Sequence, residues 1–179
     1  MIVWINGAFG SGKTTLVEQL TARRPDAVVF DPEYIGYVLR EFVPVPTGDF
    51  QDLPSWREIV AASVVSVHRH HAELLLVPMT LVSETYRRQV MDDIRGHDTQ
   101  LLEVFLDVPA DELRRRIERR VLSDDPEKDA AARAFCIAKI EECVAASNRL
   151  GPDTLVLNAG RLSPSQLAVL VLERISFSA

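Results

Sequence analysis

The sequence predicts one α/β domain built around a parallel sheet of five strands. Three observations support this fold class: the length of the chain, the alternation of short apolar runs with helical stretches, and a glycine-rich turn directly after the first run. A chain of 179 residues is long enough for one domain with a complete core and too short for two. The apolar runs are almost continuous, as expected for parallel strands that helices cover on both faces.

The strands and helices can be placed by their apolar periodicity. Five runs are expected to be strands: Ile2–Ile5, Ala27–Phe30, Leu74–Val77, Leu101–Leu106 and Thr154–Leu157. Seven stretches are expected to be helices: Lys13–Arg23, Glu33–Phe42, Ser55–His70, Glu84–Arg95, Ala110–Val121, Ala130–Leu150 and Ser165–Ile175. The last helix carries an apolar stripe that we expect to pack in the core: Leu167, Leu170, Val171 and Ile175.

Two connections lack strong periodicity. Val43–Pro54 contains three prolines and a glycine, so we expect a loop that lies over one face of the sheet. The segment around residues 122–130 is short, polar and acidic, and it joins two charged helices. We expect this second segment to be a lid within a single domain that spans residues 1–179.

Composition and charge exclude several classes of protein. The net charge is −6, with 26 acidic against 20 basic residues, so no general attraction to nucleic acid or anionic lipid is expected. The chain begins with the strand-like run Ile2–Ile5 rather than a secretory signal, and no apolar run is long enough to span a bilayer. We therefore expect a cytoplasmic protein whose two cysteines, Cys136 and Cys143, are reduced residues of one helix.

A phosphate-binding pattern follows the first expected strand. Residues 7–14 read GAFGSGKT and fit G-x-x-x-x-G-K-[ST] between a strand and a helix. Glycines let backbone N–H groups turn towards an anion, and the following helix adds its free N–H groups and the positive end of its dipole. Lys13 can reach the β- and γ-phosphates, and the Thr14 hydroxyl can bind Mg²⁺.

This pattern predicts a P-loop NTPase fold with the kinase-like strand order 2-3-1-4-5 and a site for ATP, or a related nucleoside triphosphate, with Mg²⁺. The predicted nucleotide contacts are consecutive: Gly7, Ala8, Phe9, Gly10, Ser11, Gly12, Lys13, Thr14 and Thr15.

An acidic segment leaves the second expected strand as Phe30-Asp31-Pro32-Glu33. Ligands of open parallel sheets bind beyond the carboxyl ends of the strands, so Asp31 could face the transferred phosphate and take the proton of a substrate hydroxyl. Alternatively, Asp31 only caps the next helix, because Asp before Pro is typical of a helix start. Glu33 either contacts the substrate or belongs only to the first helical turn.

The third expected strand ends without an acid, in Pro78-Met79-Thr80. ATPase motors usually place a carboxylate there, which holds Mg²⁺ and polarises water. Its replacement by a hydroxyl argues against a motor or a GTPase switch. It favours a small-molecule kinase, which must avoid activating water.

Five arginines occupy positions 114–120 of the fifth expected helix: Arg114, Arg115, Arg116, Arg119 and Arg120. Arg116 and Arg120 share one helical face and lie close to the expected lid, so they could neutralise charge that develops during phosphoryl transfer. The other three are expected to lie on a solvated surface, with Glu112 as an ion-pair partner.

Two further clusters are weaker candidates. Arg40 and Arg57 flank the proline-rich loop and could bind an anionic or polar group of the substrate. The run His68-Arg69-His70-His71 ends the third expected helix, where cationic groups are favoured. Neighbouring histidines of a helix cannot all face one ion, so we do not expect a metal site there.

Several segments resemble the bacterial tunicamycin-resistance protein family. The resemblance extends from Ile2 to Leu150 and rests on these segments: Val3–Thr14, Phe30–Glu33 with Gly36 and Leu39-Arg40, Asp49–Gln51 with Trp56-Arg57, Val77–Thr80, Arg116, Arg120 and Cys143-Val144. It implies an ATP-binding protein that confers resistance to tunicamycin, a nucleoside antibiotic with a fatty-acyl chain. Such proteins look, more distantly, like shikimate kinase and chloramphenicol phosphotransferase. Carried over from these, the catalytic base is Asp31 and the ATP-facing arginines are Arg116 and Arg120.

The leading hypothesis is therefore ATP-dependent phosphoryl transfer to a hydroxyl of a nucleoside-type antibiotic. The catalytic residues would be Lys13, Asp31, Arg116 and Arg120, and the substrate contacts Glu33, Arg40 and Arg57. Two alternatives remain: a protein that sequesters tunicamycin with ATP bound, and a metabolic kinase for which the drug is incidental. A longer family member carries a membrane-attaching tail, whereas this chain stops soon after its last helix, so membrane attachment is not expected.

Overall fold

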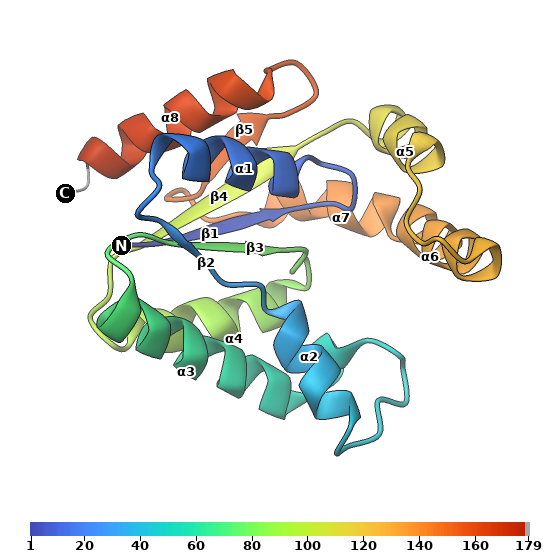
Figure 1. The fold of residues 1–179 in the computed structure, drawn as a ribbon, viewed down its shortest axis with the longest axis horizontal. Coiled ribbons are helices and arrows are strands. Elements are labelled where there is room, and N and C mark those ends of the chain that lie inside the picture. Colours follow the sequence, from blue (N-terminus) through green and yellow to red (C-terminus); the bar gives the residue numbers. More distant parts are fainter. Residues whose placement is uncertain (178–179) are drawn as a thin grey trace.

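Five parallel strands form one sheet in the order β2-β3-β1-β4-β5 in the computed structural model of the chain, which describes residues 1–177 (Figure 1). The central strand β1 (Ile2–Gly7) pairs with β3 (Leu75–Met79) on one side and with β4 (Leu101–Asp107) on the other. The edges are β2 (Val28–Val29) and β5 (Leu155–Asn158). The predicted strand order 2-3-1-4-5 is confirmed.

Helices cover both faces of the sheet (Figure 1). On one face, Val3 and Ile5 pack in a cluster with residues of α1 (Lys13–Arg23) and α8 (Pro164–Phe177). On the other face, Ile2 and Trp4 pack with residues of α3 (Pro54–His71) and α4 (Glu84–Arg95). Successive side chains of a strand point to opposite faces, so a strand between two helical layers must be apolar throughout.

The remaining helices surround the end of the sheet at which the strands finish (Figure 1). They are α2 (Glu33–Arg40), α5 (Ala110–Arg119), α6 (Pro126–Ala138) and α7 (Ile140–Ala146). Short 3-10 turns lie at Phe50–Asp52 and Ser147–Arg149. No helix among residues 1–177 is long and apolar enough to cross a membrane.

The predicted single helix Ala130–Leu150 is wrong. It is divided into α6 and α7, and α6 begins inside the segment that was expected to be a lid. Asp125 caps α6 by accepting from the N–H groups of Glu127 and Lys128, and Pro126 takes the first helical position. The division matches burial, since α6 buries no residue whereas α7 buries three. Cys136 and Cys143, expected in one helix, therefore lie in different helices, and both are free thiols.

The stripe predicted on the last helix is correct in three positions and wrong in one. Leu167, Val171 and Ile175 are buried, but Leu170 is 37% exposed, and the fully buried Ala168 packs inward instead. The second helix also ends earlier than predicted, at Arg40, and leaves Phe42 exposed. Trp56 packs in the core, and its indole N–H donates to the Pro32 carbonyl at 3.1 Å.

A buried carboxylate joins α4 to the sheet. Glu103 of β4 is within 2.6 Å of Arg87 Nη1 and 2.5 Å of Arg95 Nη2, and its side chain is only 9% exposed.

We expect Glu103→Gln to lower the free energy of unfolding by about 3–5 kcal/mol, because Arg87 would remain buried without its counter-charge. Urea denaturation measures this loss. The matched control is Arg88→Gln, which breaks an exposed pair with Glu84 and should cost about 1 kcal/mol or less. Equal losses in the two variants would contradict the prediction.

Candidate functional site

The phosphate-binding loop leaves the centre of the sheet and turns directly into α1. Gly7, Gly10 and Gly12 have φ angles of +147°, +79° and +100°, which residues with side chains rarely adopt. A Cβ atom on Gly7 would also lie 2.8 Å from Ser11 Oγ. Gly12 is the N-cap of α1, and within residues 1–177 no side chain caps that helix. The first N–H groups of α1 are therefore open to an anion.

The Lys13 ammonium lies against the loop that carries it. It donates to the carbonyls of Gly7 and Ala8 at 2.8 and 2.9 Å, and to Thr80 Oγ1 at 2.7 Å. Thr80 follows β3, and its hydroxyl donates in turn to the Gly7 carbonyl at 2.9 Å. At the position where motors place a carboxylate, this chain therefore has a hydroxyl that holds the lysine.

Burial lowers the pKa of the Lys13 ammonium to about 8 from the ordinary 10.5, against the attraction of nearby charges that include Glu33. Phosphate beside the ammonium would raise this pKa again. At a pH between the Lys13 pKa of the free protein and the higher pKa of the nucleotide complex, Lys13 is neutral in the free protein and charged in the complex. Binding of ATP would therefore take up a proton in this pH range, and we expect the affinity for ATP to fall by up to about tenfold per pH unit above the Lys13 pKa of the free protein.

Calorimetry in two buffers of different ionisation enthalpy measures this proton. We expect uptake approaching one proton at pH about 9 and almost none at pH about 7, where Lys13 is charged in both states. Equal proton uptake at the two pH values would contradict the prediction.

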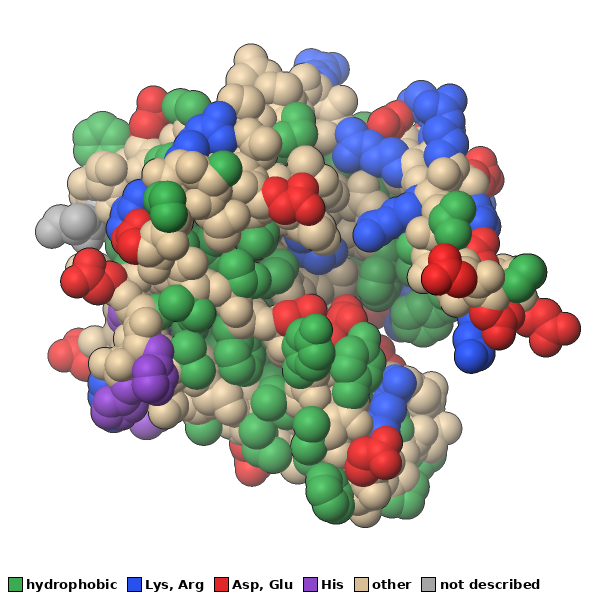
Figure 2. Space-filling view, viewed as in Figure 1, with side chains coloured by type: hydrophobic (Ala, Val, Ile, Leu, Met, Phe, Trp, Pro, Cys, Tyr) green, Lys and Arg blue, Asp and Glu red, His purple; other side chains and the backbone are tan. Residues whose placement is uncertain are grey.

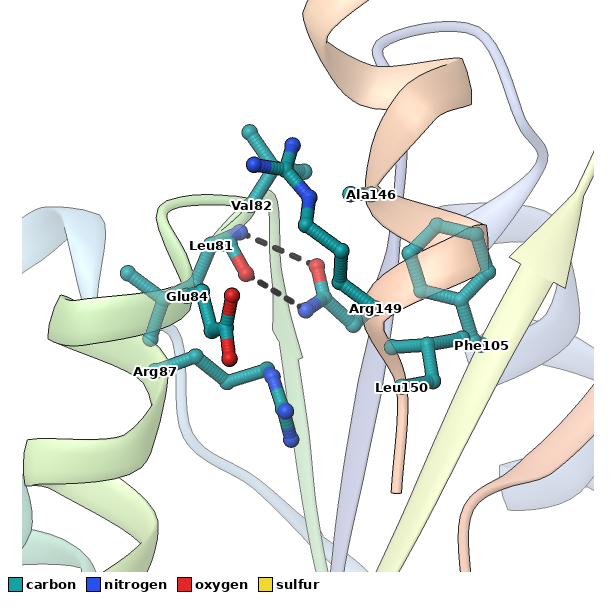
Figure 3. Close-up of a pocket in the computed structure, with 9 residues that line it drawn as sticks. Leu81, Val82, Glu84, Arg87, Phe105, Ala146, Arg149 and Leu150 are labelled. Atoms are coloured by element: carbon teal, nitrogen blue, oxygen red, sulfur yellow. Dashed lines mark hydrogen bonds between the residues drawn. The ribbon is translucent and has the colours of Figure 1, made fainter. Parts of the chain in front are cut away.

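Asn6 ties the end of β1 to the segment that follows β3. Its amide nitrogen donates to the Leu81 carbonyl at 2.7 Å, and its oxygen accepts from the N–H groups of Leu81 and Gly7 at 3.0 and 2.8 Å. Figure 3 shows the two bonds to Leu81, with Arg149 reaching over the same small cavity. That cavity is only about 10 Å³, room for roughly one water molecule. The cavity is thus too small for a substrate, and the bonds from Asn6 fix the position of the segment that carries Thr80.

A much larger cleft, about 600 Å³, opens beside the phosphate-binding loop. Its wall comes from that loop, α2, residues 47–52, the segment from β3 to α4, and the helices α6 and α7. Figure 2 shows the surface hollowed between the part that carries α5 and α6 and the rest of the molecule. Five aromatic rings line the cleft: Phe9, Tyr37, Phe50, Tyr86 and Phe135. The volume suits a small molecule.

Asp31 and Glu33 are placed differently at the end of β2. Asp31 Oδ1 accepts from the Glu33 N–H at 2.9 Å, which is the helix-capping contact that the sequence offered as the alternative role of Asp31. The Glu33 side chain lines the cleft and accepts from the Tyr37 hydroxyl at 2.8 Å. This bond raises the pKa of Tyr37 to about 12, so the phenol stays protonated and donates. The structure thus brings Glu33 into the cleft wall, while Asp31 stands at the start of α2 with its second oxygen not used in the cap.

The two arginines predicted to face ATP lie near the phosphate-binding loop. Arg116 donates to the Ala159 carbonyl at 3.0 Å, is 3.5 Å from the Gly10 and Ser11 carbonyls, and pairs with Glu112 at 2.8 Å. It therefore connects α5 to the loop and to the turn after β5. Arg120 is exposed at the end of α5, and its charge acts on Lys13.

The segment around 122–130 is anchored by two residues that sequence reasoning missed. Asp129 Oδ1 accepts from the N–H groups of Leu122 and Ser123 at 2.6 and 3.2 Å. Arg133 pairs with Asp129 and donates to the carbonyls at the end of α5, including Ile117 at 3.3 Å. Their spacing of four residues on a helix was the available signal. Closure of this segment stays a prediction.

The two arginines predicted to contact substrate hold the wall of the cleft. Arg40 lines it, donates to the Gly48 carbonyl at 2.7 Å and stands 5.2 Å over the Phe50 ring. Arg57 is 7% exposed and lies behind the wall, where it donates to the Gln51 carbonyl at 2.5 Å and to Gln89 Oε1 at 2.7 Å. It therefore contacts the end of the proline-rich loop at Gln51.

The histidine run closes α3 away from the cleft. His68 contacts the amino group of Met1 at 3.2 Å and the Ala72 carbonyl at 2.7 Å. In the part of the chain that the structure describes, no group of three or more His, Cys, Asp and Glu side chains is arranged to hold a metal ion.

Comparison with known proteins extends the sequence resemblance. Residues 2–141 match the family model described as "AAA domain". The solved tunicamycin resistance protein of Deinococcus radiodurans is 25% identical, with a TM-score of 0.74 over 97% of this chain and 94% of that chain. The suspected resemblance to tunicamycin-resistance proteins is thus confirmed. A search of curated protein sequences gives no match.

Two kinases share the fold at lower identity. The Mycobacterium tuberculosis APS kinase, solved with AMPPNP and APS, is 21% identical with a TM-score of 0.66 over 98% of this chain and 96% of that chain. A sugar kinase from Janibacter sp. is 18% identical with a TM-score of 0.68 over 98% and 94%. Together with the strand order, they confirm the predicted kinase-like P-loop fold.

Proposed function

The chain belongs to the AAA domain family, and we propose that it transfers the γ-phosphoryl group of ATP to a hydroxyl of a small molecule, with a nucleoside-type antibiotic such as tunicamycin as the acceptor. The observation that carries this proposal is the position of the 600 Å³ cleft, which opens directly beside the phosphate-binding loop. Direct transfer needs donor and acceptor in contact. The similarity to the Deinococcus radiodurans protein supports the choice of acceptor.

The phosphate-binding loop fits a nucleotide with Mg²⁺. Three glycines with positive φ leave room for phosphate, and Ser11 Oγ is buried without a hydrogen-bond partner in the described part of the chain. The N–H groups of residues 8–15 and the Lys13 ammonium would hold the phosphates, and the Thr14 hydroxyl would hold Mg²⁺. When bound, Mg²⁺ neutralises charge on the transferred group.

Four further residues, Asp31, Glu33, Arg116 and Arg120, would complete the reaction. Asp31 takes the proton of the acceptor hydroxyl, and Glu33, in the wall of the cleft, contacts the acceptor. Arg116 and Arg120 supply positive charge near the loop, where negative charge develops on the transferred group. The Thr80 hydroxyl in place of a carboxylate limits activation of water, which favours transfer over hydrolysis.

Mass spectrometry of tunicamycin after incubation with the protein, ATP and Mg²⁺ tests the proposal. We expect the drug to gain one phosphate, with release of one ADP per phosphate transferred. Unmodified drug that nevertheless binds the ATP-loaded protein in calorimetry would identify a sequestering protein. If tunicamycin is neither bound nor phosphorylated, but ADP is released when a metabolite is supplied as acceptor, the protein is a metabolic kinase.

A further inference from the structure

The wall of the 600 Å³ cleft has an excess of negative charge. It contains four carboxylates, from Glu33, Asp49, Asp52 and Glu142, but only two cationic groups, from Arg40 and Lys139. Its formal charge is therefore −2 before any nucleotide binds. Bound ATP would add further negative charge at the neighbouring loop.

Both cations of the wall are already engaged by the protein. The Lys139 ammonium pairs with Glu142 at 2.9 Å. The Arg40 guanidinium donates to the Gly48 carbonyl and stands over the Phe50 ring. A carboxylate, sulfate or phosphate group of an acceptor is ordinarily bound by the paired N–H groups of a free guanidinium. The guanidinium of Arg57 lies behind the wall and is bonded to Gln51 and Gln89.

The carboxylates keep acceptor capacity and outnumber the cations four to two in the wall. Within residues 1–177, one oxygen of each is used: Glu33 accepts from Tyr37, Asp52 from Tyr86, Asp49 from the Gln51 N–H, and Glu142 pairs with Lys139. The second oxygen of each can accept from a hydroxyl or an ammonium. Aromatic rings between them offer flat apolar surface for a sugar or a base.

We propose that this cleft selects acceptors that carry several hydroxyl groups and no negative charge, that is, neutral or amine-bearing sugars and nucleosides, and that it rejects anionic acceptors. Like charges brought together in a cleft with low-dielectric walls oppose binding, whereas opposite charges are concentrated there. The transfer itself rests on the proposed function, but the selection by charge does not.

A cysteine probe measures this selection without any catalysis. In a Cys136→Ser, Cys143→Ser background, Ala132→Cys places one thiol in the cleft wall on α6. Its reaction rates with a cationic and an anionic methanethiosulfonate of similar size are compared with the rates of a free small thiol. We expect about a tenfold preference for the cationic reagent beyond that of the free thiol.

Matched variants assign this preference to the wall. Asp49→Asn with Asp52→Asn keeps the oxygens that accept from Gln51 and Tyr86, and should remove most of the preference. Asp93→Asn, exposed on α4 and outside the cleft, should leave it unchanged. A preference for the anionic reagent, or no change in the double variant, would overturn the proposal.

A turnover assay extends the test to two series of related acceptors whose members differ in charge. ADP release is measured with glucose, glucosamine and gluconate, and with uridine and its monophosphate. Any member that is used should be neutral or cationic, and faster use of an anionic member than of its neutral counterpart would overturn the proposal. No ADP release with any of these compounds or with tunicamycin, together with the expected thiol preference, would reject the transfer reaction and leave the selection by charge standing.

Discussion

Lys13→Ala is expected to lower the affinity for ATP by roughly ten- to a hundredfold, and phosphoryl transfer with it, while the protein remains folded. The substitution removes a charge-assisted contact to phosphate, worth about 1.5–3 kcal/mol, which converts to that loss of affinity. Stability should survive, because burial disfavours the charged ammonium in the free protein, as its lowered pKa indicates. Titration calorimetry with ATP and thermal unfolding measure the two quantities.

The matched control is Lys128→Ala. Lys128 lies on α6, its side chain is 78% exposed, and among residues 1–177 that side chain pairs only with Asp125, at 3.6 Å on the surface. Its removal should leave affinity and melting temperature within error of the wild type. Wild-type affinity of a folded Lys13→Ala variant would refute the assignment of the phosphate site.

The phosphate-binding loop and the strand order could be predicted because their signals are local or repeat along the chain. The backbone conformations of Gly7, Gly10 and Gly12 require glycine, so the positions of glycine in the motif predict the shape of the loop. Both faces of the sheet are covered, so each strand appears as an apolar run. The fold follows from these two features and short right-handed connections.

The cleft wall could not be predicted in the same way, because its contacts join distant parts of the chain. Arg57 was expected to face the substrate, but its partner Gln89 lies 32 residues further along and draws it behind the wall. The division between α6 and α7 matches a difference in burial: α7 places Ile140 and Cys143 in the core, whereas α6 buries no residue and packs only the partly buried Cys136 and Ile137 against it. Two local signals were available in the sequence: the Asp125-Pro126 helix start and the four-residue spacing of Asp129 and Arg133.

The assignment of the catalytic base carries the largest expected effect. Asp31→Asn should lower phosphoryl transfer by ~10²- to 10⁴-fold, the usual worth of a positioned base, with ATP affinity and melting temperature almost unchanged. Asn keeps the oxygen that accepts from the Glu33 N–H, so the start of α2 is preserved. It cannot accept a proton. Single-turnover rates of phosphate transfer, measured at saturating ATP, report this loss directly.

Glu33→Gln is the decisive comparison, because Glu33 lies two residues from Asp31 and its side chain, unlike that of Asp31, lines the cleft. If Glu33 only contacts the acceptor, Glu33→Gln should raise the KM for the acceptor and reduce kcat by less than about tenfold, since only ground-state binding is weakened. If Glu33→Gln instead carries the large loss in kcat while Asp31→Asn transfers at nearly the wild-type rate, the base is Glu33. Asp31 is then a helix cap, and Asp31→Ala should cost about 1 kcal/mol of stability without a matching loss of transfer. If the wild type transfers no phosphate, and neither substitution changes tunicamycin resistance in cells whereas Lys13→Ala removes it, the protein protects by holding the drug and needs no base.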